Sequence, residues 1–92
     1  MSPAKLYLGF TRGAQLNLRQ VLDYTDQTWG PEQSAIYEDE IFASLDLLRE
    51  HPAIGIARPT FAPGCRFHPV KSHVIYYRVI DDTVEVVRIL HY

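Results

Sequence analysis

The feature that most constrains the fold is a glycine-proline pair, Gly30-Pro31, which separates two long stretches with a helical spacing of apolar residues. The first stretch predicts a helix that runs to about residue 28, with Thr11 placed to cap its start. The second predicts a helix over residues 31–51, because the residue before Pro52 is pushed out of helical geometry. With so short a link, the helices fold back on each other as an antiparallel hairpin, and their apolar faces need a sheet to cover.

Strand patterns occupy most of the remaining chain. β-Branched and aromatic residues dominate a closing hairpin that turns at Asp81-Asp82, and Pro69 predicts that a short strand before it ends at a sheet edge or a bulge. The predicted strands are residues 4–10, 65–68, 74–80 and 84–90. The order β-α-α-β-β-β predicts an α+β fold, with a helical hairpin packed on a small, mostly antiparallel sheet.

Size and composition narrow the class of protein. A chain of 92 residues predicts a single domain, residues 1–92. Its composition, with 47% hydrophobic and 22% charged residues, excludes a disordered chain. A single cysteine, Cys65, excludes an internal disulfide framework and fits a reducing cytoplasm. The first ten residues lack the apolar run of a signal peptide, and no stretch is long enough to cross a membrane. We therefore expect a cytoplasmic protein without a membrane partner.

Strict alternation along the closing hairpin predicts a second, unusually apolar sheet face. One face must meet the helices, yet the other still combines valine, tyrosine and arginine, a composition typical of an interface core. This predicted binding face consists of Val74, Tyr76, Arg78, Val86 and Arg88. The charge is also uneven: residues 1–51 hold four basic and eight acidic residues, whereas the remainder holds five basic and three acidic. The sheet side is therefore expected to meet something anionic.

The sequence holds no strong catalytic motif, and its histidine spacing predicts neither a metal site nor a cofactor. Four arginines lie in the second half of the chain, which holds the predicted loop and sheet. In one interpretation they are solvated and paired with carboxylates of the helices; in the other they bind phosphates or the carboxylates of a partner. They are Arg58, Arg66, Arg78 and Arg88. His51, His68 and His73 are interpreted as capping or surface residues, and Cys65 as a packed thiol.

The one pair that resembles an acid/base set is His91-Tyr92 at the end of the last strand. A histidine beside a phenol could move protons in RNA cleavage, with Arg88 stabilising the charged phosphorane. The alternative is that these two residues simply end a strand, which is the interpretation we favour.

Several segments together resemble the ParE branch of the RelE/ParE toxin superfamily. They are Trp29-Gly30, His51-Pro52-Ala53-Ile54-Gly55, Gly64-Cys65-Arg66, the segment from Ser72 to Val79, and the segment from Val86 to His91. The resemblance covers nearly the whole chain. It implies a toxin of a type II toxin–antitoxin pair, neutralised in a hetero-oligomer by a ParD-like antitoxin that wraps it. ParE-type toxins are associated with inhibition of DNA gyrase, growth arrest and plasmid stabilisation, whereas RelE-type relatives cut messenger RNA on the ribosome.

The residues favour the ParE branch. Val74 stands directly after His73, where RNA-cleaving relatives can carry an arginine, and the strand that follows is tyrosine-rich. The first hypothesis is therefore a gyrase inhibitor rather than an enzyme, in which the four arginines contact the target. In this hypothesis the antitoxin lies over the surfaces of both helices and over the predicted binding face. The second is a ribosome-dependent ribonuclease that uses His91, Tyr92 and Arg88 and binds nucleic acid directly. The third is a decayed toxin that retains only antitoxin binding.

Overall fold

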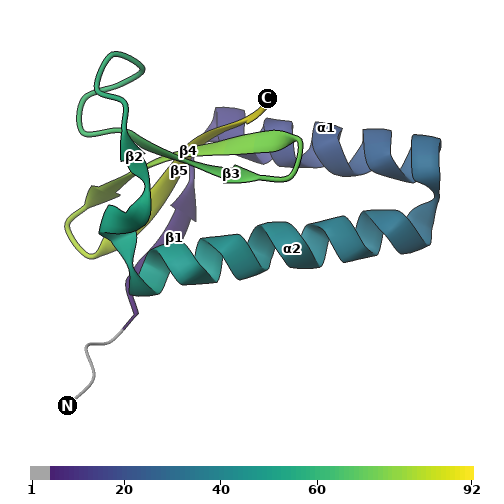
Figure 1. The fold of residues 1–92 in the computed structure, drawn as a ribbon, viewed down its shortest axis with the longest axis horizontal. Helices are drawn as coiled ribbons and strands as arrows, with labels where there is room; N and C mark the ends of the chain where they lie inside the picture. Colours follow the sequence, from purple (N-terminus) through teal and green to yellow (C-terminus); the bar gives the residue numbers. More distant parts are fainter. Residues whose placement is uncertain (1–4) are drawn as a thin grey trace.

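A computed structural model describes residues 5–92 and places a helical hairpin against one face of a five-stranded sheet (Figure 1). In chain order the elements are β1 (Tyr7–Phe10), α1 (Arg12–Trp29), α2 (Pro31–Glu50), the short 3-10 helix η1 (Pro52–Ile54), β2 (Ile56–Ala57), β3 (Arg66–Val70), β4 (His73–Ile80) and β5 (Thr83–His91). The predicted order is confirmed, and the two-residue β2 is added within the predicted loop. Ala4, the first residue of the predicted first strand, lies outside the described residues.

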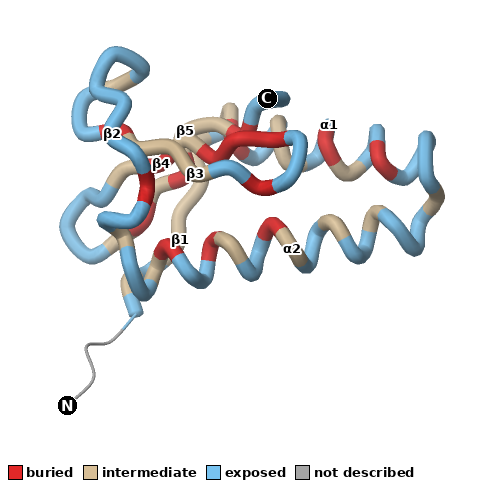
Figure 2. The backbone as a smooth tube through the Cα atoms, in the orientation of Figure 1, coloured by how far each residue is buried: buried red, intermediate tan, exposed pale blue. Residues whose placement is uncertain are grey.

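The helix ends follow from local chemistry. The Thr11 side chain accepts a hydrogen bond from the Ala14 amide at 3.1 Å, which satisfies one of the free donors at the start of α1. Gly30 adopts a φ of 96°, which a residue with a side chain rarely adopts, and Pro31 begins α2. The linked ends of the two helices project past the β3–β4 turn (Figure 1). Figure 2 shows that these projecting ends are largely exposed.

The sheet order is β1-β5-β4-β3-β2, with β1 parallel to β5 and the other pairs antiparallel. The prediction that the strand over residues 65–68 is broken at Pro69 is wrong, because the β3–β4 ladder continues to Val70. Proline is tolerated there because β2 pairs only with Arg66 and Phe67, which leaves the outer edge of β3 unpaired beside it. The predicted turn at Asp81-Asp82 is confirmed, with Asp81 at a φ of 54°.

The core lies between the helices and the inner face of the sheet, which is the face that the helices cover. Its fully buried members from α2 are Ile41, Leu45 and Leu48, and those from the sheet are Ile75, Tyr77, Val84 and Val86. Leu6, just before β1, and Leu8 and Phe10 from β1 pack against this cluster. The opposite, outer face of the sheet carries Tyr76 and its neighbours.

A bulge in β5 overturns part of the predicted binding face. Tyr76 pairs with Arg88 while Tyr77 pairs with Val86, so Val87 is an extra residue with no partner on β4. A one-residue shift moves every earlier side chain of the strand to the other face. The prediction that Val86 shares a face with Arg88 is therefore wrong, since Val86 lies in the core with no exposed surface. Val74 is on the outer face but only 6% exposed.

Candidate functional site

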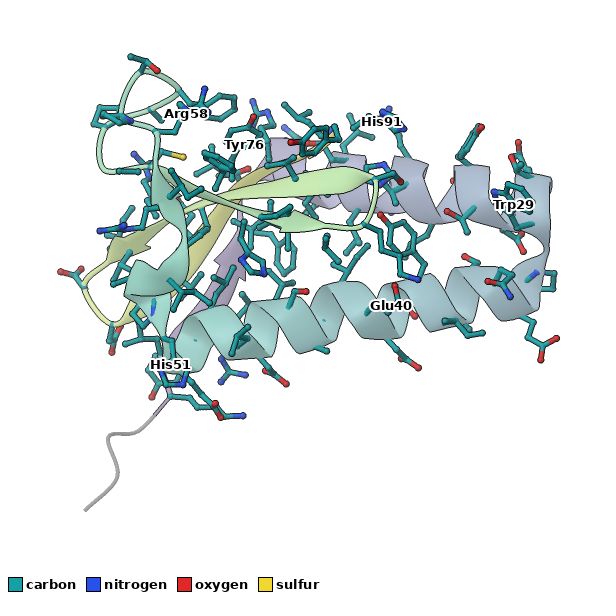
Figure 3. All side chains as sticks on the ribbon, viewed as in Figure 1. Trp29, Glu40, His51, Arg58, Tyr76 and His91 are labelled. Atoms are coloured by element: carbon teal, nitrogen blue, oxygen red, sulfur yellow. The ribbon has the colours of Figure 1, made fainter. Side chains whose placement is uncertain are left out.

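The outer face of the sheet carries a cluster of aromatic and arginine side chains. Tyr76 stacks on Phe61 with 4.1 Å between ring centroids, and Phe67 lies tilted beside it at 6.3 Å. The Arg58 guanidinium lies 4.8 Å from the Phe67 ring centroid, a cation–π distance. Figure 3 shows Arg58 and Tyr76 at the same end of the sheet, where the loop after β2 folds back.

The four predicted arginines do not form one cluster. Arg78 lies on the outer face and pairs with Glu85 on the neighbouring strand at 2.9 Å. Arg66 points to the other side, where it donates to the Gly55 carbonyl oxygen at 2.8 Å and holds the segment after α2. Arg66 therefore does not share a surface with Arg58 and Arg78, because its position on β3 opposes the inward-facing Tyr77. Arg58 and Arg78 remain as outer-face cations.

The alternative catalytic set is divided between the two faces. Arg88 pairs with the outward-facing Tyr76, whereas His91 lies on the helix side with its ring 5.1 Å from that of His73. Tyr92 is 82% exposed, and its amide donates to the Ser72 carbonyl oxygen at 2.7 Å. Alternation along β5 therefore starts the Arg88 and His91 side chains on opposite faces, and the Arg88 guanidinium is held at the first turn of α1 while the His91 ring lies against His73.

A groove runs along α1 on the side that faces the end of β5. One hollow of about 360 Å³ lies between α1 and the end of β5, and a second of about 250 Å³ lies between the projecting helix ends and the β3–β4 turn. The two hollows share Tyr24, His73 and His91, so we treat them together as the α1 groove. Its rim exposes large apolar side chains: Tyr24 at 65%, Trp29 at 71% and Ile36 at 44%. An exposed apolar rim of this kind marks a binding surface.

The sequence placed the antitoxin over the helices but did not reveal this groove or the residues that line it. Trp29 continues the helical spacing of apolar residues in α1, which predicts a core-facing position, but the last turn of α1 projects beyond the sheet (Figure 3). No periodicity reports how far a helix extends past its sheet. The available signal was the presence of tyrosine, tryptophan and isoleucine on both sides of the helix link.

The floor of the α1 groove is polar and tightly connected. The Tyr37 hydroxyl lies 2.6 Å from Nδ1 of His73, and Lys71 pairs with Glu40 at 3.0 Å. Burial, with a smaller contribution from the charge of His91, lowers the pKa of His73 below 6.5. Burial likewise raises the pKa of Tyr37 above 10.0. Both groups are therefore neutral at neutral pH.

This arrangement predicts a loss of stability in mild acid. A histidine whose pKa is lower in the folded state stabilises the fold above its unfolded pKa of about 6.5, and this contribution is lost as the pH falls below that value. One such group changes the free energy of unfolding by at most about 1.4 kcal/mol per pH unit. Urea unfolding of His73→Asn, which keeps a polar atom near the Tyr37 hydroxyl, is expected to depend less on pH between 7 and 5 than the wild type. An unchanged pH dependence would contradict this role of His73.

Cys65 and His51, which the sequence analysis also considered, have roles in packing and in ending a helix. Cys65 is 1% exposed, and burial raises the pKa of its thiol, which disfavours the reactive thiolate. His51 ends α2, where its amide donates to the Leu47 carbonyl oxygen. Within residues 5–92, no group of three or more potential ligand side chains is arranged to hold a metal ion. None of the helices in that part of the chain is both long and apolar enough to span a membrane.

Comparison with known proteins identifies the family. Residues 8–92 match the family described as ParE toxin of type II toxin-antitoxin system, parDE. The chain belongs to the ParE toxin family. It is 36% identical over 91 residues to Toxin ParE1 of Caulobacter vibrioides, covering 99% of this chain and 90% of that protein. It is 37% identical over 79 residues to Toxin ParE1 of Mycobacterium tuberculosis, covering 85% of this chain and 81% of that protein.

Solved structures share the fold of this ParE family member. A chain of the chromosomal ParDE toxin–antitoxin system from P. aeruginosa superposes with a TM-score of 0.79 at 24% identity, covering 95% of this chain and 96% of that one. A chain of the RelBE2 toxin–antitoxin complex from Mycobacterium tuberculosis superposes with a TM-score of 0.62 at 22% identity. The superposition covers 97% of this chain and 93% of that one. Both structures come from toxin–antitoxin systems.

Proposed function

We propose that this ParE-type toxin arrests growth in the cytoplasm by binding DNA gyrase, without cutting nucleic acid itself. We further propose that a ParD-like antitoxin neutralises it by filling the α1 groove. The observation that carries the choice of mechanism is the position of the Arg88 guanidinium, which is held at the first turn of α1 by Thr11, whereas the His91 ring lies against His73 at the Tyr24 end of the α1 groove. An acid/base group and the cation that assists it must reach the same reacting atoms to act together, and this arrangement does not bring Arg88 to His91.

The outer face supports a role in target contact. Tyr76, Phe61 and Arg58 combine flat aromatic surface with a cation, the side-chain types that dominate the energy of protein–protein contacts. Arg78 is half-buried and already paired with Glu85, so its contribution would be to orient a partner rather than to add a free charge. The target face proposed here is therefore Arg58, Phe61, Phe67, Tyr76 and Arg78.

The groove supports a role in antitoxin binding. Tyr24, Trp29 and Ile36 expose apolar surface that the chain itself does not cover. Covering such surface is the main favourable contribution to stable association. The groove and the target face lie on opposite sides of the sheet, so neutralisation on this proposal does not require the antitoxin to occupy the target face.

Purified gyrase tests the mechanism directly. We expect the toxin to inhibit DNA supercoiling, and Tyr76→Ala together with Arg58→Ala to raise the half-inhibitory concentration at least about tenfold, as expected for two contact residues. Lys5→Ala, which removes an exposed cation at the other end of the chain, serves as the matched control. No inhibition at a large excess of toxin would reject gyrase as the target.

The ribonuclease alternative makes a different prediction. If the chain cut messenger RNA, primer extension after induction would reveal discrete codon-linked cleavage, and His91→Ala would abolish it. We expect no such cleavage by the wild-type toxin, and we expect the His91→Ala variant to arrest growth fully. Growth that continues normally when the toxin is expressed without antitoxin would favour the decayed toxin instead.

A further inference from the structure

Arg88 is held in an unusual place at one end of the α1 groove. From the outer face it reaches over the edge of β5 to the first turn of α1, where Nη1 donates to the Val87 carbonyl oxygen at 2.7 Å and to Thr11 Oγ1 at 3.3 Å. Gly13 makes this possible, because a Cβ atom at that position would collide with the guanidinium. The next turn of α1 brings Asn17 into the lining of the groove.

No carboxylate balances this guanidinium among residues 5–92. The ion pairs there use Lys5, Arg49, Lys71 and Arg78 as cations, and Arg88 is not one of them. The first turn of α1 holds no acidic residue, and it carries the exposed Arg12 beside Gly13, with Arg19 two turns further. A cation beside other cations and beside the positive end of a helix is electrostatically unfavourable without an anion.

We propose that Arg88 is a carboxylate-binding site at the end of the α1 groove, and that the antitoxin segment in the groove carries an acidic residue to it. The inference rests on the proposed role of the groove in antitoxin binding. A guanidinium has five N–H donors, and of the Arg88 nitrogens only Nη1 has a partner within the described part of the chain. Nε and Nη2 can therefore form the paired hydrogen bonds that a carboxylate accepts.

The chemistry around Arg88 favours an acidic peptide over a nucleic acid. The chain has a net charge of −2, and a phosphate backbone contacts an extended row of cations rather than one anchored arginine with two neighbours. The adjoining groove is lined by Val21, Tyr24 and Leu90, which suit apolar side chains of a peptide. The segment that we infer therefore alternates apolar residues with at least one glutamate or aspartate near the Arg88 end.

The test uses the purified toxin alone, with an amidated hexaglutamate peptide as the acidic probe and hexathymidylate as the nucleic-acid probe. Arginine Nε–Hε resonances are followed by NMR at low ionic strength. We expect hexaglutamate to shift the Arg88 resonance with a millimolar dissociation constant, and added salt to weaken binding. A preference for hexathymidylate, or no shift of the Arg88 resonance by hexaglutamate, would overturn the proposal.

Two variants separate a specific site from general charge attraction. Gly13→Ala keeps every charge and favours the helix, yet it displaces the guanidinium, so the hexaglutamate dissociation constant should rise at least about threefold. Arg88→Gln, which lacks the guanidinium resonance and is followed by the backbone amide resonances of the first turn of α1, should do the same. Lys5→Gln, which removes a distant charge, should leave the constant unchanged. Equal weakening by Lys5→Gln and Arg88→Gln would overturn the proposal. Because neither probe involves gyrase or antitoxin, the result is independent of the test of the proposed function.

Discussion

Replacing Tyr24 and Trp29 with alanine is expected to weaken antitoxin binding at least about a hundredfold. Exposed aromatic side chains at the centre of an interface often contribute about 2 kcal/mol or more each, and each such loss changes the dissociation constant about thirtyfold. These two side chains are 65% and 71% exposed in the free toxin, so their removal leaves the core intact. Calorimetric titration with the ParD-like protein that the adjoining reading frame is expected to encode measures the change.

An exposed aromatic residue outside the groove provides the control. Tyr7 is 66% exposed on β1, nearly the same as Tyr24, but it pairs with Thr83 at the other end of β5. Tyr7→Ala removes a similar area of exposed surface and should leave the dissociation constant within about twofold, as for a residue outside the interface. If Tyr24→Ala/Trp29→Ala bound the antitoxin as tightly as Tyr7→Ala, the antitoxin would not dock in the α1 groove.

The helices and the closing hairpin could be predicted because their signals are local. Thr11, Gly30 and Pro31 mark helix ends by their own backbone chemistry, and periodic apolar residues set the length between them. The acidic pair at Asp81-Asp82 likewise marks the turn without reference to the rest of the chain. Once these elements are placed, few arrangements bury their apolar faces, so the packing of the helices on the sheet could be predicted.

The candidate site could be predicted only in part, because it depends on contacts between distant segments. The bulge at Val87 lies in a run of β-branched residues, where one extra residue leaves no mark in the pattern, so Val86 was assigned to the wrong face. The direction of Arg66 depends on carbonyl groups after α2. The position of Arg88 depends on Gly13, 75 positions earlier in the chain, whose missing side chain leaves the space. None of these contacts produces a periodic pattern in the sequence.

Gly55→Ala is expected to destabilise the fold by about 2 to 4 kcal/mol, an unusual loss for one added methyl group. The backbone is not the cause, since Gly55 has a φ of −68° and a ψ of 154°, which alanine adopts freely. The cause is Tyr77, whose buried hydroxyl accepts a hydrogen bond from the Gly55 amide at 2.9 Å and donates to the Pro52 carbonyl oxygen at 2.7 Å. A Cβ at Gly55 would collide with that hydroxyl and lie 2.7 Å from the nearest ring carbon.

A double-mutant cycle with Tyr77→Phe isolates this contact, measured by urea unfolding. Tyr77→Phe alone should cost about 1 to 3 kcal/mol, because it leaves the buried Gly55 amide without a partner. In the double variant the contact with the ring carbons remains, but the collision with the hydroxyl is absent and the hydrogen bond is lost only once. The combined loss should therefore be smaller than the sum of the two single losses. Gly9→Ala is the control, since a Cβ there would meet only Thr83 Cγ2 at an ordinary 3.4 Å and should change stability by less than about 1 kcal/mol. Additive losses would mean that Gly55 matters for a reason other than the Tyr77 hydroxyl, and that this hydroxyl is not what fixes the segment after α2 against the sheet.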